Sequence, residues 1–222
     1  MMQGKLIVLE GVDGSGKSTQ YEKLCSRLEA ENRPFVKLVF PRYDKESSAL
    51  IRMYLKGGFG SSPNDVNPYA ASTFFAVDRY ASHKEEWGAH YSSGGLVLCD
   101  RYTTSNAVHQ GSKLPDDKLG GFLEWLYDFE FRLLGLPRPD LVLYMDVDAD
   151  CCISGLKHRQ TVTNTEGDIH ETDIDYLKNC LRAGSRAADV LGWKKIKCVK
   201  GGLMRNVDEI HLEVYDEVER MV

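Results

Sequence analysis

A glycine-rich segment near the N-terminus combines residue types that bind phosphate. A strand-like apolar run precedes it and a helical pattern follows it, and it ends in Lys17 and Ser18. Glycines let the backbone bend so that N–H groups converge on phosphate oxygens, while the lysine reaches the outer phosphates and the serine hydroxyl can bind Mg²⁺. The segment matches G-x-x-x-x-G-K-[ST], and the residues expected to bind ATP are Gly11, Val12, Asp13, Gly14, Ser15, Gly16, Lys17, Ser18 and Thr19.

One acidic residue, Asp13, lies inside this loop. Phosphates repel its carboxylate, so a ligand-binding Asp13 needs a compensating partner. Mg²⁺, an arginine or a hydroxyl group of a second substrate could each supply one. The alternative is an ordinary solvated aspartate in a turn.

A second acid, Asp100, ends an apolar strand-like run and is followed by Arg101. Parallel sheets hold their ligands at the carboxyl ends of the strands. Asp100 therefore lies where an acid would bind Mg²⁺, directly or through water. The guanidinium of Arg101 can form bidentate hydrogen bonds with a phosphate. Asp146 also ends an apolar run, but no arginine accompanies it, which favours a structural role.

Phe75 and Arg79 are four residues apart in a predicted helix and share one face,. A ring and a guanidinium together could stack on a planar base and bind its edge. On spacing alone, however, Phe75 is better explained as a core residue.

A basic run, Lys157 to Arg159, lies in a polar segment with few large apolar residues. Phosphoryl transfer spreads negative charge over the transferred oxygens, and a basic group that closes over them stabilises that charge. The segment therefore suggests a mobile lid at about residues 155–172. Taken alone, a basic run is more often a solvated face.

The elements that must position these residues alternate along the chain. Five apolar runs predict strands at 5–10, 35–40, 95–100, 140–146 and 195–199. Helical patterns lie between and after them, at 17–31, 47–56, 68–91, 116–135, 173–191 and 207–221. Continuous apolar strands are typical of a parallel sheet with helices on both faces. We expect the α/β class: one domain over residues 1–222, with three α/β/α layers and a five-stranded parallel sheet.

Composition narrows the possible partners. The net charge of the 222 residues is −5, which does not favour nucleic acid as a partner,. No apolar stretch approaches the about 18 residues of a membrane span, and no secretory leader is evident, so we expect a cytoplasmic protein. The six cysteines form no Cys-x-x-Cys pair and are expected to be reduced and mostly buried,.

The chain as a whole resembles the thymidylate (dTMP) kinases. The resemblance implies the P-loop nucleoside monophosphate kinase fold, phosphoryl transfer from ATP to dTMP with Mg²⁺ to give dTDP for dTTP synthesis, and a homodimer. The matching segments, in family order, are LEGVDGSGKSTQ at Leu9–Gln20, FPRY at Phe40–Tyr43, FAVDR at Phe75–Arg79, DRYTTSNAVHQG at Asp100–Gly111, PDLVLYMDVD at Pro139–Asp148 and GLKHR at Gly155–Arg159.

The resemblance also implies roles for single residues. Asp13 is similar to the family's P-loop acid, close to the nucleotide 3′-hydroxyl and the metal. Phe75 resembles the ring that stacks on the base, and Arg79 the residue that reads the thymine carbonyl edge. Arg101 resembles the clamp on the dTMP phosphate. The other implied dTMP contacts are a phosphate helper, an apolar wall and a polar group near the base: Arg42, Phe40 and Asn106.

Two features place this chain within the family. Some members carry a catalytic arginine inside the P-loop, and this chain has no basic residue between Gly11 and Gly16. It therefore resembles the type whose lid supplies the charge, with Arg159 as first choice and Lys157 as second. Where the family usually has Tyr or Phe against the deoxyribose, this chain has His109. We hypothesise that His109 still contacts the sugar; an unchanged dTMP-to-UMP ratio of kcat/KM in His109→Tyr would contradict this.

Three alternatives stay open at this point. A deoxynucleoside kinase would need a carboxylate base near a bare 5′-hydroxyl and would need phosphate-binding arginines less. A GTP-dependent switch protein would carry an Asn-Lys-x-Asp segment, which this sequence lacks. A catalytically idle member of the family is the third, although Lys17, Asp100, Arg101 and Arg159 are all present.

Overall fold

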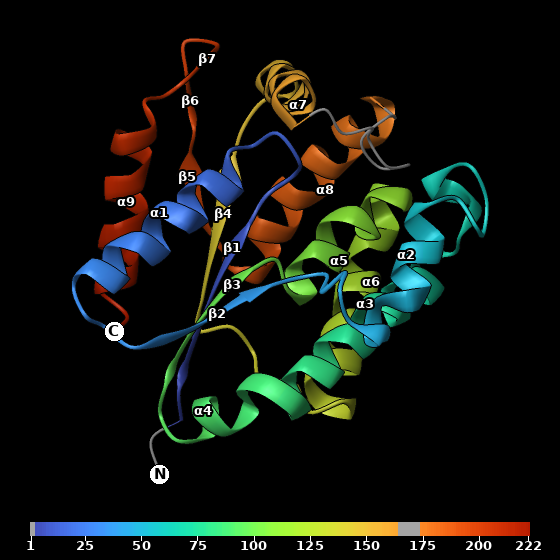
Figure 1. Ribbon diagram of the computed structural model, residues 1–222. Helices are drawn as coiled ribbons and strands as arrows, with labels where there is room; N and C mark the ends of the chain where they lie inside the picture. Colours follow the sequence, from blue (N-terminus) through green and yellow to red (C-terminus); the bar gives the residue numbers. More distant parts are fainter. Residues whose placement is uncertain (1–2, 164–173) are drawn as a thin grey trace.

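The computed structural model in Figure 1 describes the backbone of residues 3–163 and 174–222, and the side chains of these ranges except 157–163. Its central sheet has five parallel strands in the order β2-β3-β1-β4-β5. These strands are β1 (Lys5–Glu10), β2 (Phe35–Val39), β3 (Leu96–Asp100), β4 (Leu141–Asp146) and β5 (Lys194–Lys197). The predicted α/β class and five-stranded parallel sheet are confirmed.

Helices cover both faces of this sheet, as Figure 1 shows. One face packs against α1 (Lys17–Ala30) and α9 (Val207–Glu219), and the other against α5 (Thr103–His109), α6 (Asp116–Tyr127) and α8 (Ile174–Leu191). Leu6 and Val8 belong to the core on the α5–α8 side, whereas Ile7 and Leu9 belong to the core on the α1–α9 side. Successive side chains of a strand point to opposite faces, which explains why the four residues Leu6 to Leu9 of β1 are all apolar,.

The long helix predicted at residues 68–91 consists of three helical pieces. They are α3 (Pro68–Ser82), a π-helical turn (His83–Trp87) and α4 (Gly88–Ser92). The helix predicted at 116–135 likewise continues from α6 into a π-helical turn (Asp128–Leu133). The predicted helix at 47–56 is a 3₁₀ turn (Glu46–Ser48) followed by α2 (Ala49–Leu55).

The remaining elements are short or follow β4. Further 3₁₀ turns lie at Pro63–Asp65 and Gly111–Lys113, and a small hairpin pairs β6 (Val199–Lys200) with β7 (Leu203–Met204). After β4, α7 (Ala149–Thr163) begins the segment expected to form the lid. Most of the predicted lid, 157–172, lies outside the residues whose side chains the structure describes.

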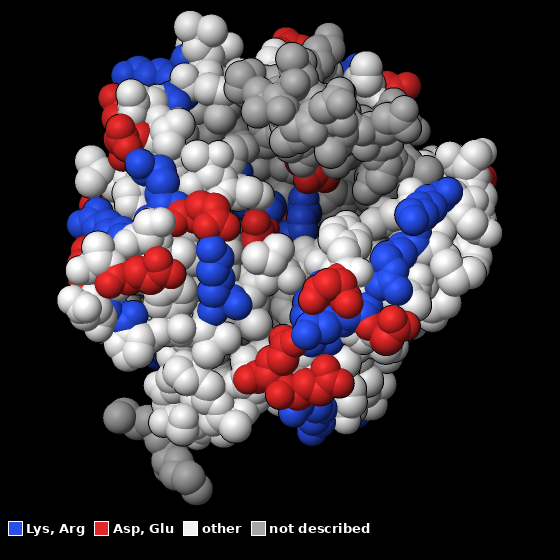
Figure 2. Space-filling model, in the orientation of Figure 1, with Lys and Arg blue, Asp and Glu red and all other residues white. Residues whose placement is uncertain are grey.

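The surface charges and the cysteines were both described by predictions from the sequence. Basic and acidic side chains are interspersed on the face shown in Figure 2, with no broad field of one sign. All six cysteines are unpaired and buried, as predicted. Among the described residues, no helix has the length and apolar character needed to cross a membrane.

Candidate active site

The P-loop joins the carboxyl end of β1 to the N-terminus of α1. Gly14 and Gly16 have φ values of +83° and +82°, a left-handed conformation that glycine adopts without strain,. A Cβ atom on Gly14 would also stand 2.3 Å from the carbonyl oxygen of Cys152 on α7. Within residues 3–156 and 174–222, whose side chains the structure describes, no side chain caps the start of α1. Its first N–H groups are therefore available to an anion, as in other phosphate-binding helix N-termini.

Lys17, Ser18 and Asp100 meet at the end of β3. Lys17 forms a short buried ion pair with Asp100, and the Ser18 hydroxyl donates to the second carboxylate oxygen at 3.2 Å. Burial and the nearby Arg101 lower the pKa of Lys17. A carboxylate beside a hydroxyl is a hard-oxygen ligand set, and Mg²⁺ typically takes one or two protein ligands besides phosphates and water. The residues present therefore fit Mg²⁺.

Arg101 lies directly after Asp100 and turns back toward the P-loop. Its φ of +68° is rare for a residue with a side chain and costs roughly 1–3 kcal/mol,. This conformation directs the guanidinium to Asp13, which accepts a hydrogen bond from Nη2 at 2.7 Å. Of the possible partners for Asp13, the structure thus provides an arginine.

Glu10 is a site residue that the sequence analysis missed. Its side chain is fully buried at the end of β1, and its carboxylate accepts hydrogen bonds from the Gly11 N–H (2.9 Å), Thr104 (2.6 Å) and Ser105 (2.7 Å). Arg101 lies 3.6 Å from it. Glu10 therefore ties the P-loop to α5 and to Arg101. The only sequence signal is its place at the end of an apolar strand.

Two cavities adjoin the P-loop, and the first is the predicted acceptor site. This acceptor pocket has a volume of about 280 Å³ and lies between the end of β3, α3 and α5. The structure brings most of the predicted dTMP contacts and catalytic groups to its wall: Asp13, Lys17, Phe40, Phe75, Arg79, Arg101, Asn106 and His109.

Arg79 is held in this wall by Glu130, a residue that sequence reasoning also missed. The two form a bidentate buried ion pair, with Nε of Arg79 at 2.7 Å from the carboxylate. Glu130 also accepts from Thr103 at 2.6 Å and from Asn106 at 3.2 Å. One fully buried carboxylate therefore orients two predicted base contacts, Arg79 and Asn106.

Arg42 is the predicted dTMP contact that the structure leaves away from the pocket. Its guanidinium donates to Asp78 at 3.1 Å and to Ser47 at 2.9 Å, and pairs with Glu86 at 2.9 Å. Among the described residues, the neighbours that line the pocket instead are Phe40, Pro41 and Tyr43. Its role as a phosphate helper stays a prediction.

Gln110 is a pocket residue with an unused side-chain amide. It is fully buried and lines the acceptor pocket, yet neither its Oε1 nor its Nε2 has a hydrogen-bond partner among the described residues. An unsatisfied buried polar group costs roughly 1–3 kcal/mol. A ligand with both a donor and an acceptor on one edge would remove that cost. The sequence offered no signal beyond its place after His109.

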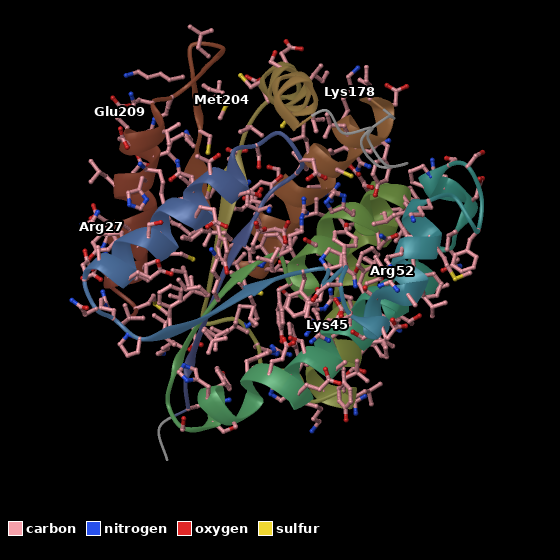
Figure 3. All side chains as sticks on the ribbon, in the orientation of Figure 1. Arg27, Lys45, Arg52, Lys178, Met204 and Glu209 are labelled. Carbon is pink, nitrogen blue, oxygen red and sulfur yellow. The ribbon has the colours of Figure 1, made fainter. Side chains whose placement is uncertain are left out.

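The second cavity, the donor pocket, has a volume of about 690 Å³. Its walls are the P-loop and Thr19, the first turns of α7, and the β6–β7 hairpin with the residues that follow it. Met204, labelled in Figure 3, reaches from this hairpin to within 3.7 Å of the Cβ position of Gly16. Gln20 on α1 donates to the Val207 carbonyl at 2.9 Å, and its Oε1 has no partner among the described residues.

The predicted lid residues, Lys157 and Arg159, belong to α7. Their side chains lie outside the described residues, so their catalytic role stays a prediction. The described start of α7 touches the P-loop, because Gly155 packs on Gly14 so closely that a Cβ atom on Gly155 would stand 2.5 Å from the Gly14 carbonyl oxygen. The described part of the segment therefore starts next to the phosphate-binding loop.

A strand, P-loop and helix with an acid at the end of a neighbouring strand form the phosphate-binding core of the P-loop nucleotide-binding proteins. The family model for thymidylate kinase matches residues 9–196. The chain belongs to the thymidylate kinase family.

Curated relatives agree over most of the chain. A thymidylate kinase of Mycobacterium tuberculosis is 34% identical over 200 residues, which cover 85% of this chain and 87% of the relative. One from Pelotomaculum thermopropionicum is 26% identical over 221 residues, covering 100% and 95%. A probable thymidylate kinase of Pyrococcus horikoshii is 32% identical over 162 residues, covering 73% and 74%.

Proposed function

We propose that this protein transfers the γ-phosphoryl group of ATP to dTMP, giving ADP and dTDP. The observation that carries this proposal is that the donor and acceptor pockets share Asp13, Lys17 and Ser18. A triphosphate on the P-loop and a monophosphate in the acceptor pocket therefore meet at the same three side chains. Membership in the thymidylate kinase family supports the same reaction.

The acceptor pocket suits a pyrimidine monophosphate. Phe75 offers a ring face to a planar base, and the unpaired amide of Gln110 matches an edge that carries one N–H and one carbonyl, as thymine does,. Arg79 and Asn106, both held by Glu130, add donors on the same wall. Arg101 at the other end supplies the positive charge for the phosphate.

Mg²⁺ would be held by Ser18 and Asp100, directly or through water, with Asp13 nearby. When bound, it neutralises charge on the donor phosphates. Lys17 would exchange its pairing with Asp100 for the outer phosphates of ATP. Because the attacking phosphate is already ionised, no protein base is required, and these residues act by positioning and by neutralising charge.

The remaining roles are those implied by the resemblance to family members whose lid supplies the catalytic charge. Arg159, and secondarily Lys157, would add positive charge from the lid as the phosphoryl group moves. The protein would act as a cytoplasmic homodimer with ATP and dTMP as its ligands. The segment Leu119–Leu134 is a candidate for the dimer contact, although part of it, including Phe122 and Leu126, is buried in the core of a single subunit.

A deoxynucleoside kinase is disfavoured by the site's carboxylates. Such an enzyme needs a carboxylate base beside a 5′-hydroxyl, yet Glu10 is fully engaged by N–H and hydroxyl donors and Asp13 by Arg101. An arginine at this point suits a phosphate better than a neutral hydroxyl.

The test is product identification. The protein is incubated with ATP, Mg²⁺ and dTMP, and the nucleotides are separated by anion exchange, with Lys17→Ala as the control. We expect equimolar ADP and dTDP from the wild type and a loss of both in the variant. ADP formation that does not depend on dTMP would contradict the proposal.

A further inference from the structure

His109 touches the arginine expected to hold the acceptor phosphate. It lies at the end of α5, lines the acceptor pocket and is 9% exposed. Its ring atom Nε2 is 3.0 Å from Nη1 of Arg101. A guanidinium carries only donors, so Nε2 must be the acceptor and His109 must be neutral.

The tautomer of His109 follows from this contact. A neutral imidazole that accepts at Nε2 carries its proton on Nδ1. Nδ1 lies 3.6 Å from the Sγ atom of Cys180 on α8, and this sulfur can accept a hydrogen bond from the Nδ1–H group,. Burial and the charge of Arg101 both lower the pKa of His109, to about 3, so the ring stays neutral at any ordinary pH.

The surroundings of His109 fix its position firmly. Figure 1 shows α5 and α8 side by side, and Tyr176 of α8 donates to the His109 carbonyl oxygen at 2.9 Å. Ser112 donates to the same oxygen at 2.8 Å and accepts from the Cys180 thiol at 3.4 Å. Backbone and ring are therefore both anchored to α8.

We propose that His109 is a positioning residue whose Nε2 holds the Arg101 guanidinium in the orientation that receives the acceptor's phosphate. This inference rests on the proposed function and deepens it. Arg101 has several competing acceptors, since Asp13 takes Nη2 at 2.7 Å, and Ser105 and Glu10 lie 3.3 Å and 3.6 Å from Nη1. The neutral Nε2 acceptor is 3.0 Å from Nη1, closer than Ser105 or Glu10, and so competes with the carboxylates for this group.

The proposal differs from simple packing of His109 against the sugar. A packing role needs a ring, whereas a positioning role needs an acceptor atom. His109→Phe keeps a ring and removes the acceptor. His109→Gln removes the ring and keeps an acceptor at a similar distance from Cα, so the two variants separate the roles.

The test compares binding of dTMP and thymidine by calorimetry, because thymidine lacks the phosphate that Arg101 would hold. In His109→Phe we expect the Kd for dTMP to rise about tenfold and that for thymidine to change less than about twofold. In His109→Gln we expect dTMP affinity within about threefold of wild type. Melting temperatures confirm that both variants are folded.

Two results would overturn the inference. The first is equal weakening of dTMP and thymidine in His109→Phe, which would indicate packing on the nucleoside. The second is the same loss of dTMP affinity in His109→Gln as in His109→Phe. If the proposed function itself were wrong, the wild type would fail to bind dTMP, which is a distinct outcome.

Discussion

The two pockets that meet at the P-loop are lined by different kinds of residue. The donor pocket is lined by the P-loop and by residues of α7 and the β6–β7 hairpin, several of which are small or apolar, such as Gly155, Leu203 and Met204. The wall of the acceptor pocket includes buried polar side chains that other buried side chains orient, as Glu130 orients Arg79. Phosphates can be bound by backbone N–H groups in the right conformation, whereas a base must be read by side chains.

This contrast predicts different consequences of mutation. In the donor pocket few side chains matter, but those few act on the transferred phosphate. In the acceptor pocket many side chains matter for binding, and some of them also hold the fold.

The largest effect is expected at Lys17, one of the three residues that both pockets share. Lys17→Ala should lower kcat about 10³-fold, since a preorganised charge on the phosphates is lost. The matched control is Lys23→Ala, a lysine further along α1 that pairs with Asp208 at 2.8 Å on the surface. Steady-state rates and melting curves of both variants check this. Similar rates in the two variants would contradict the role of Lys17.

Glu130 tests whether the acceptor pocket supports the fold. Glu130→Gln should reduce the free energy of unfolding by about 3 kcal/mol, because it leaves the buried Arg79 charge uncompensated,. Asp128→Asn is the control, since it breaks an exposed pair with Arg132 in the same π-helical turn and should change stability by less than about 1 kcal/mol,. Urea unfolding measures both, and equal losses would remove the distinction between the pair types.

Arg159 tests the charge expected from the lid. Arg159→Ala should lower kcat roughly 10²-fold and change dTMP affinity less than about threefold, because lid charge acts mainly in the transition state. Lys157→Ala should lose less activity. Equal losses in kcat and dTMP affinity, or no loss at all, would count against the assignment.

Gln110 tests whether a residue of the acceptor pocket can contribute to dTMP binding without contributing to the stability of the fold. Gln110→Met removes an unpaired buried amide while keeping similar volume, so the free energy of unfolding should stay the same or rise,. The Kd for dTMP should rise about tenfold, since the base loses its partner. Calorimetry and urea unfolding are the measurements. A less stable variant with unchanged dTMP affinity would mean that Gln110 serves the fold alone.

The smallest effect is a pH dependence from His109. The pKa of folded His109 is about 3, whereas an unfolded histidine takes up its proton near about 6.5,. Below pH 6.5 the unfolded state therefore binds more protons, so stability falls as pH falls. Between pH 6 and 5 the wild type should lose about 1 kcal/mol more than His109→Gln. Parallel urea curves at the two pH values check this, and identical losses would contradict it.

The sequence predicted the sheet and the P-loop well because their signals are local. Continuous apolar runs mark β1, β3 and β4, and the loop motif is a single short segment. Helix α5 was not predicted, because its seven residues are rich in threonine and serine and have weak helical preference,. Packing on α8 sustains this helix. The β6–β7 hairpin was not predicted because each strand has only two residues.

The site residues also divide into those that local sequence signals predicted and those whose roles depend on the fold. Most of the predicted dTMP contacts inside motifs line the acceptor pocket, including Phe75, which spacing alone assigned to the core. The role of Glu130 was not predicted because its partners Arg79 and Asn106 are distant in sequence. Only the fold shows that these three side chains meet. Arg42 is turned away because Asp78, on a neighbouring helix, holds its guanidinium.

The most direct test of the account is the ratio of kcat/KM for dTMP to that for thymidine, measured with ATP and Mg²⁺ by coupled detection of ADP. We expect saturable turnover of dTMP and no measurable turnover of thymidine, because Arg101 would pair with the acceptor's phosphate and, among the described residues, Asp13 already accepts a hydrogen bond from Arg101. Turnover of thymidine comparable to that of dTMP would contradict it.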